Sequence, residues 1–385
     1  MFKKLSKKII FILLIMVIGG LGGIIANRYF FPYLSATKLF SKYEFLKKSA
    51  ENVTVINKTE QVFVKEDSSV EKIASLASSS VVNIISISEL ERKTMPAGTA
   101  SISTKNTTGL IVTSDGLIAT YAPDIDPGKT KFKVLTFDGN SYDGQFFGLD
   151  AYSNLAFLKI SAANLPTVSF GNSDDTVPGE KVLTIGNSLG SFGYLYQAGL
   201  LRSFNPAYNL AGKTVSSSEK LEGVFDTDFN LQAALVGGPI VDYSGKVIGM
   251  VGFLNKNNGA EYFQIPSNKI KNVIDRAIKK ELDQDPSLGI YYLTIDKTLA
   301  LANNLSRDKG ALVYSPSGQQ GLAIISGSSA QKAGLAINDI IISVDDQEIN
   351  LQNSLADILY KFKKGDQIEL KVLRNGQELK IPVQL

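Results

Sequence analysis

A chain of 385 residues is long enough for two or three domains that each bury a hydrophobic core. It contains no cysteine, which excludes disulfides and thiol nucleophiles, and no histidine, which excludes the commonest general base near neutral pH. A Ser-His-Asp triad therefore cannot be assembled from this chain. The net charge of +3 reflects a basic N-terminus, and we find no basic face of the kind that nucleic-acid binding needs. We expect no nucleic-acid partner.

Residues 9–26 form an uncharged apolar stretch, IIFILLIMVIGGLGGIIA. As a helix rising about 1.5 Å per residue, it would span roughly 27 Å, close to the thickness of a hydrocarbon core. Lysines precede it, so the positive-inside rule puts residue 1 in the cytoplasm. A cleaved signal peptide is the alternative, although no small-x-small cleavage site follows. We expect residues 1–28 to be a cytoplasmic stub and a single-pass inner-membrane anchor, with the main domains extracytoplasmic or periplasmic.

The rest of the chain changes from polar to β-rich. Residues 29–68 are mixed and polar without a strong period, which indicates a linker. A short amphipathic helix is expected from residue 69, with Ile73, Leu76 and Ala77 on one face. Short apolar runs then alternate with turn signals such as SDG, FDG and YSG, which predicts a barrel or sandwich. A helix is expected over residues 268–282.

The β-rich region contains a series of motifs in a fixed order: SSSVVNI, GLIVTSDGLIAT, NLAFLKI, KVLTIGNSLG, VFDTD, GGPIVDYSGKVIG and FQIPSN. In this order they resemble the HtrA/Deg family of trypsin-like serine proteases. The resemblance implies a mostly β, chymotrypsin-like domain over residues 69–282. In that domain two six-stranded antiparallel barrels would pack together, with the active site in the cleft between them.

The resemblance also assigns the family's catalytic positions to residues of this chain. Its histidine falls at Pro123, its aspartate at Asn154, and its serine nucleophile at Val236. Proline has no titratable group to accept a proton, asparagine lacks the charge of aspartate, and valine has no hydroxyl to attack a carbonyl. The oxyanion loop would contain Ala234 and Gly237, with alanine where the family has glycine. We therefore expect a pseudoenzyme of the serine-type endopeptidase family whose cleft is a packed remnant.

Other side chains offer weaker chemistry. Serine–lysine dyads would need one of several serines that lie in no recognisable dyad motif, namely Ser188, Ser191 and residues 216–218. Asp150 and Asp228 match acids of the family pattern outside the triad and are expected in turns or caps. Asp124 and Asp126 alone do not predict a metal site. We expect neither a metal nor a cofactor.

Residues 286–385 resemble a PDZ domain of the kind that follows HtrA-type protease domains, on the segments PSLGIYYLTI, SGSSAQKAGLAINDIIISVDDQEI and KGDQIELKVLRNGQELKIPVQL. PDZ domains bind a peptide as an added strand and hold its terminal carboxylate with backbone amides. The resemblance puts that loop at Ser287, Leu288, Gly289 and Ile290, with the pairing strand starting at Tyr291. Leu288 and Ile290 indicate an apolar pocket for the last side chain of the peptide. The alternative is a PDZ domain that only packs on the barrels.

Three functions follow from these patterns. The first is an inactive HtrA-like protein that binds unfolded or C-terminal peptides as a scaffold or regulator in envelope protein quality control. The resemblance implies that such a protein forms a homotrimer or joins active HtrA-type proteases in a hetero-oligomer. The second is an active endopeptidase with non-standard residues. The third is a structural envelope protein without a peptide ligand.

Overall fold

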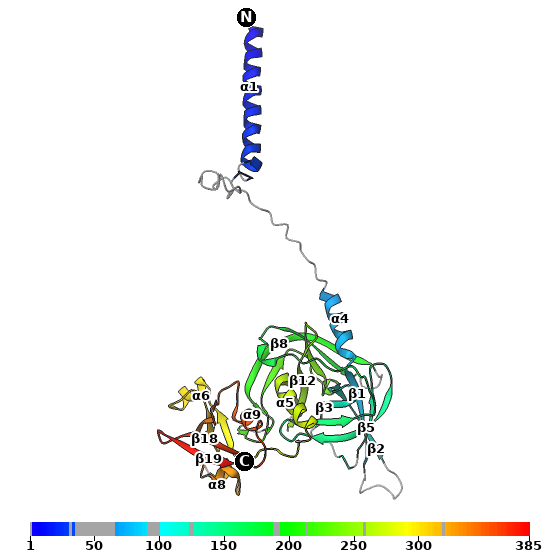
Figure 1. The fold of residues 1–385 in the computed structure, drawn as a ribbon, viewed down its shortest axis with the longest axis vertical. Helices are drawn as coiled ribbons and strands as arrows, with labels where there is room; N and C mark the ends of the chain where they lie inside the picture. The colour runs from blue at the N-terminus through cyan, green and yellow to red at the C-terminus, as the bar shows by residue number, and fades with distance from the viewer. Residues whose placement is uncertain are drawn as a thin grey trace. The chain divides into compact units, whose positions relative to one another are not determined.

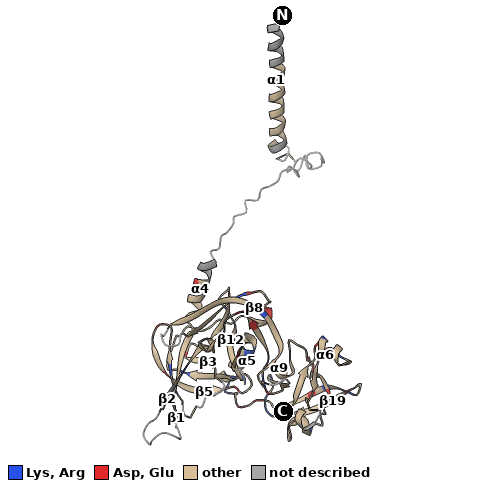
Figure 2. Ribbon diagram, turned by 180° about the vertical axis from the view of Figure 1, so that it is seen from behind, with Lys and Arg blue, Asp and Glu red and all other residues tan. Residues whose placement is uncertain are grey.

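The structure is a computed structural model of the 385-residue chain. It describes residues 2–30, 33–34, 66–90, 101–122, 127–128, 130–187, 193–212, 215–256, 259–317 and 320–385. The chain divides into two compact units, Met1–Val64 and Lys65–Leu385. Figure 2 shows acidic and basic residues interspersed along the second unit.

The first unit contains a 24-residue helix, α1 (Phe2–Ile25), followed by a π-helical turn, η1 (Ala26–Phe30). The sequence predicted a membrane-spanning segment over residues 9–26. Crossing a bilayer takes about 20 consecutive, predominantly apolar residues. Within the described residues, no helix combines the length and the hydropathy needed to span a membrane. The predicted anchor is therefore not supported.

The second unit begins with helix α4 (Glu66–Ser78), which leads into a closed six-stranded antiparallel barrel (Figure 1). Its strands pair in the order β1-β2-β3-β6-β5-β4. They are β1 (Val81–Leu90), β2 (Ser101–Ile111), β3 (Leu117–Tyr121), β4 (Thr130–Leu135), β5 (Ser141–Leu149) and β6 (Leu155–Lys159). Alternation places the apolar side chains inside, as β4 shows, where buried Phe132 and Val134 alternate with exposed Lys131 and Lys133.

A second closed barrel follows, with strand order β10-β13-β12-β11-β7-β8. Its strands are β7 (Lys181–Asn187), β8 (Tyr194–Asn209), β10 (Glu222–Thr227), β11 (Pro239–Asp242), β12 (Val247–Lys256) and β13 (Gly259–Pro266). The 3₁₀ turn η2 (Ser173–Asp175) lies in the connection between the two barrels, and a second one, η3 (Ala233–Leu235), lies between β10 and β11. Helix α5 (Ser267–Ile278) closes the domain and buries Ile270, Val273 and Ile274 against the core. The expected double barrel is confirmed.

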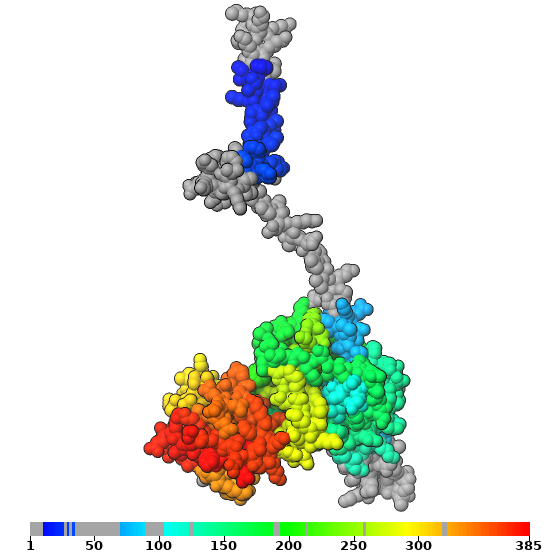
Figure 3. Space-filling view, viewed as in Figure 1, coloured from blue at the N-terminus to red at the C-terminus, as the bar shows by residue number. Residues whose placement is uncertain are grey.

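The C-terminal domain is a sheet with short helices around it, and Figure 3 shows its orange and red surface beside the yellow-green second barrel. The elements are β14 (Tyr291–Thr294), α6 (Lys297–Ala302), β15 (Ala311–Val313), α7 (Gln320–Ala323), α8 (Ser329–Lys332), β16 (Ile340–Val344), β17 (Gln347–Glu348), α9 (Leu355–Leu359), β18 (Gln367–Arg374) and β19 (Gln377–Gln384). The sheet order is β19-β18-β16-β15-β14-β9, with β17 paired to β16. The last strand, β9 (Ser216–Ser217), comes from the connection between β8 and β10 of the second barrel.

Candidate functional site

Val236, which the resemblance puts at the nucleophile position, lies directly after the 3₁₀ turn η3 and is 4% exposed. Its amide donates to the carbonyl of Ala233 at 3.2 Å, and its carbonyl accepts from the amide of Thr108 in the first barrel at 3.0 Å. Both backbone groups of Val236 are therefore used within the protein. Pro123, at the histidine position, lies outside the described residues.

The loop that would form an oxyanion hole is packed against strand β2. Ala234 is buried, and its carbonyl accepts from the hydroxyl of Thr108 at 3.3 Å. Gly237 has a φ of 78°, and a Cβ there would stand 2.0 Å from the carbonyl oxygen of Thr108. An oxyanion hole needs two amides directed at one developing charge. Because the Val236 amide is bonded to Ala233, it does not point at such a charge in this structure.

Asn154, which the resemblance puts at the aspartate position, has a φ of 61°. Asparagine tolerates this left-handed conformation better than most residues. Its side-chain amide donates to the hydroxyl of Tyr121 at 3.3 Å, and its oxygen accepts from Lys220 at 3.4 Å. Burial lowers the pKa of Lys220. The side chain therefore belongs to a polar contact between the first barrel and the connection after β8.

Asp150 and Asp228 occupy structural positions. Asp150 is fully buried and accepts from the amide and hydroxyl of Ser153 and from the hydroxyl of Tyr360. Burial raises its pKa. Asp228 accepts from the amide of Leu200 at 2.7 Å. Two of the dyad candidates, Ser188 and Ser191, lie outside the described residues, as do Asp124 and Asp126.

The serines at residues 216–218 bond to glutamates. Ser216 donates to Glu222, while Ser217 and Ser218 both donate to Glu219. A Ser-Lys dyad needs the hydroxyl to face a lysine amine that accepts its proton. These three hydroxyls instead donate to carboxylates and to the carbonyl of Ile290.

The loop expected to bind a peptide carboxylate contacts these same residues. The amide of Gly289 donates to a carboxylate oxygen of Glu219 at 2.7 Å. The amide of Ile290 donates to the hydroxyl of Ser218 at 3.0 Å, and the amide of Ser218 donates back to the carbonyl of Ile290 at 3.1 Å. These bonds continue into the ladder between β9 and β14, where Tyr291 faces Ser217. The expected pairing edge is thus covered by the chain itself.

The loop residues differ in exposure. Ser287 is exposed, whereas Leu288 and Ile290 are buried in the core of the C-terminal domain. Gly289 has a φ of 79°, and a Cβ there would stand 2.3 Å from the Cβ of Ser328. The close packing against Ser328 therefore requires glycine at this position. A bound carboxylate would be a second reason for a residue without a side chain here.

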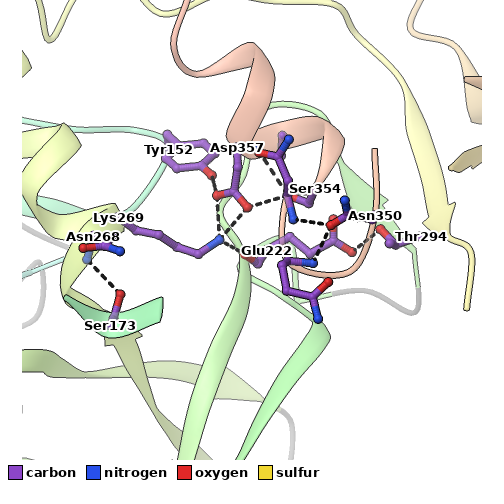
Figure 4. Close-up of polar contacts among 12 residues, drawn as sticks. Tyr152, Ser173, Glu222, Asn268, Lys269, Thr294, Asn350, Ser354 and Asp357 are labelled. Carbon is purple, nitrogen blue, oxygen red and sulfur yellow. Dashed lines mark hydrogen bonds and ion pairs between the residues drawn. The ribbon is translucent and has the colours of Figure 1, made fainter. Parts of the chain in front are cut away.

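Around strand β9, buried polar groups connect the barrels to the C-terminal domain (Figure 4). Glu222 is 1% exposed and accepts from Ser216, from Tyr292 at 2.6 Å and from Thr294 at 2.8 Å. Burial raises the pKa of Glu222. Lys269 of α5 forms an ion pair with Asp357 of α9 at 2.6 Å.

A cavity of ≈ 170 Å³ lies beside the covered loop. It is lined by Ala151, Tyr152, Ser218, Glu219, Asp285, Pro286, Ser287, Ala356 and Tyr360. The rings of Tyr152 and Tyr360 stack with centroids 4.1 Å apart. Sequence reasoning did not single out Glu219, Glu222, Lys269 or Asp357, because isolated charged residues in connections form neither a periodic pattern nor a motif.

Comparisons with known proteins identify both domains. Residues 98–250 match the trypsin-like peptidase domain, and residues 286–385 match the PDZ domain. A "Probable periplasmic serine endoprotease DegP-like" of Chlamydia muridarum is 31% identical over 279 residues, covering 72% of this chain and 53% of that protein. A "Serine protease Do-like HtrA" of Bacillus subtilis is 30% identical over 271 residues, covering 67% and 58%. The chain spans about half the length of the curated relatives it matches.

Solved structures share the fold. The HtrA-type protease AlgW with a decapeptide has a TM-score of 0.60 and 22% identity, covering 82% of this chain and 97% of that one. The same protease with a tripeptide has a TM-score of 0.62 and 24% identity, covering 82% and 95%. Fold and domain matches together define a trypsin-like double β-barrel followed by a PDZ domain. The chain is similar to proteases of the HtrA/Deg family in both of these domains.

Proposed function

We propose that this chain is a catalytically inactive HtrA-type protein that binds peptide C-termini through its PDZ domain. In this proposal it acts as a scaffold or regulator in envelope protein quality control. Residues 69–282 are the inactive barrel domain and residues 286–385 the peptide-binding domain, joined to the N-terminus by the linker over residues 29–68.

The main support for a loss of catalysis is the buried aliphatic side chain of Val236 at the predicted nucleophile position. Its amide is bonded to Ala233, and the sequence contains neither histidine nor cysteine to replace the lost groups. Loss of triad residues costs on the order of 10⁴ to 10⁶ in rate in well-studied proteases. We therefore expect no turnover of peptide bonds.

An activity-based probe tests this proposal. The purified full chain is incubated with a fluorophosphonate and, separately, with casein, alongside trypsin as the positive control. We expect trypsin alone to be labelled and to cleave casein. Stoichiometric labelling of this chain, or casein cleavage that increases with its concentration, would contradict the proposal.

A variant that restores the triad residues tests whether activity is absent because the catalytic side chains are missing or because the oxyanion loop is closed. It combines Pro123→His, Asn154→Asp and Val236→Ser. We expect this variant to remain inactive, because the amide of residue 236 is held by Ala233 and cannot stabilise an oxyanion. Robust proteolysis by the variant would show that the loop opens into a working oxyanion hole.

The alternative function is an active serine-type endopeptidase that uses non-standard residues. It is favoured by the names of the relatives, which describe serine proteases. The probe and casein experiments distinguish it from the inactive protein, because a working enzyme needs an activated nucleophile whatever its base.

Peptide binding is supported by the PDZ domain and by the peptides bound to the HtrA-type protease AlgW. An extracytoplasmic location is supported by relatives named as periplasmic. Assembly as a homotrimer, or with active HtrA-type proteases, remains part of the proposal. Sedimentation of the purified chain, alone and mixed with an active HtrA-type protease, measures it; a monomer in both samples would remove that part.

A further inference from the structure

The connection between β8 and β10 runs beside β14 in the direction that a bound C-terminal peptide takes. Tyr291 pairs with Ser217 and Tyr292 with Ser216 in antiparallel register. Residue numbers in β9 therefore rise toward the amide loop, where Ser218 pairs with Ile290. A PDZ ligand is likewise an antiparallel added strand whose C-terminal end lies at that loop.

Glu219 supplies a carboxylate at the end of this strand. Its side-chain oxygen accepts from the amide of Gly289 at 2.7 Å, and the hydroxyl of Ser218 accepts from the amide of Ile290 at 3.0 Å. A peptide terminus would offer its own carboxylate to such backbone amides. Because each amide has a single hydrogen to donate, a peptide terminus and Glu219 compete for the Gly289 amide.

The covering residues are anchored on both sides. Ser216 donates to the buried carboxylate of Glu222, which also accepts from Tyr292 of the PDZ strand. The amide of Leu221 donates to the carbonyl of Tyr152 in the first barrel at 3.0 Å. The contact is thus a strand with defined register and fixed ends.

We propose that residues 216–219 are an internal ligand of the PDZ domain, with Glu219 in the place of a peptide carboxylate. An external peptide must displace them, so the chain has a closed state and a peptide-bound open state. This inference rests on the proposed function, that the PDZ domain binds peptide C-termini.

The cavity beside the strand indicates the side chain that an external ligand brings. Ser218, the residue nearest the loop in the internal strand, has a small side chain, and ≈ 170 Å³ next to it is unfilled. A cavity of roughly 150 Å³ admits benzene in a well-studied case. Tyr152, Ala356 and Tyr360 contribute apolar surface to its wall. A peptide ending in Leu or Phe therefore gains contacts that Ser218 does not make.

Substitution of Glu219 tests the competition. Glu219→Ala removes the acceptor of the Gly289 amide, and Ser218→Ala removes the acceptor of the Ile290 amide without a change of charge. Glu71→Ala, at an exposed position of α4, matches the charge change of the first variant. Fluorescence anisotropy measures the binding to each full-length protein of labelled peptides that end in Ser, Leu or Phe. Each peptide is made with a free carboxylate and as the C-terminal amide.

We expect Glu219→Ala to bind the free-carboxylate Leu and Phe peptides about tenfold more tightly than the wild type. Ser218→Ala should show a smaller gain, Glu71→Ala no gain, and the amidated peptides no comparable binding. Equal affinity of wild type and Glu219→Ala for these peptides would overturn the internal-ligand proposal and leave peptide binding intact.

Amide hydrogen exchange gives a readout that needs no peptide. The Gly289 amide should exchange slowly in the wild type and in Glu71→Ala, and faster in Glu219→Ala, with the exchange in β18 and β19 unchanged. This pattern without binding of any peptide would support the internal ligand and refute the proposed peptide-binding function. Fast exchange of Gly289 in the wild type would overturn the internal ligand itself.

Discussion

The ion pair between Lys269 and Asp357 ties the second barrel to the PDZ domain, and its loss should be costly. The nitrogen–oxygen distance is 2.6 Å, and the two side chains are only 14% and 17% exposed. Asp357 also accepts from the hydroxyl of Tyr152 at 2.7 Å, and Lys269 donates to the carbonyl of Glu222 (Figure 4). Each charge is thus largely removed from water and stabilised by the other.

Asp357→Asn removes the negative charge and keeps the size of the side chain and one oxygen for Tyr152. Breaking a buried pair by neutralising one partner costs about 3 to 5 kcal/mol, because the remaining charge is left unpaired. Since Lys269 keeps the Glu222 carbonyl and some solvent contact, we expect about 3 kcal/mol. Glu369→Gln is the control, because Glu369 and Lys380 are 48% and 71% exposed and such pairs contribute at most about 1 kcal/mol.

Urea unfolding measures the free energies by circular dichroism and by tyrosine fluorescence, which is accessible because the chain has no tryptophan. Lys269→Met and the double variant Lys269→Met with Asp357→Asn complete a double-mutant cycle. We expect the double variant to be less destabilised than the sum of the two single ones. An effect of Asp357→Asn no larger than that of Glu369→Gln, or additive effects in the cycle, would refute the reasoning.

Two further predictions concern backbone packing and pH. Gly237→Ala should lower the free energy of unfolding by more than 2 kcal/mol, because its Cβ would collide with a backbone oxygen, whereas Gly139→Ala, with a similar φ but open space, should cost about 1 kcal/mol. Equal costs in urea unfolding would argue against close packing of that loop. Burial and the charge of Asp150 raise the pKa of Asp285 to about 6, despite Arg276. A carboxyl whose pKa rises on folding contributes stability at low pH, and this contribution is lost as pH rises through the folded-state pKa. From about pH 4 to about pH 7 the wild type should therefore lose stability relative to Asp285→Asn; parallel curves for the two proteins would contradict this assignment.

Local patterns predicted much of the fold. The Asn375–Gly376 turn closes the β18–β19 hairpin with φ values of 50° and 80°, as a type I′ turn requires. The helix expected over residues 268–282 is present but ends at Ile278, and Lys280 adopts a φ of 58°. The guanidinium of Arg276 donates to the carbonyls of residues 281, 360 and 362. The path of the chain after α5 therefore depends partly on contacts with residues that are distant in the sequence, which local patterns do not predict.

The sequence predicted some parts of the candidate site and missed others. The sequence predicted a degenerate nucleophile position at Val236 and an amide loop at Gly289, since both follow from ordered motifs. It gave no indication that Glu219 would occupy the loop, because the two residues are 70 positions apart. The sequence suggested the serines at residues 216–218 only as members of a Ser-Lys dyad. In the structure their hydroxyls donate to glutamates.

The amino-acid sequence by itself determined that this protein has neither histidine nor cysteine, and the order of its motifs predicted an aliphatic residue, Val236, at the nucleophile position. Composition and order are enough for that conclusion, because chemistry requires particular side chains. The tertiary structure alone decided which segment covers β14. Strand pairing uses backbone groups that nearly every residue carries, so local sequence does not specify the partner of an open edge. Strand β9 becomes the partner of β14 because the packing of the barrels brings Glu219 to the Gly289 amide.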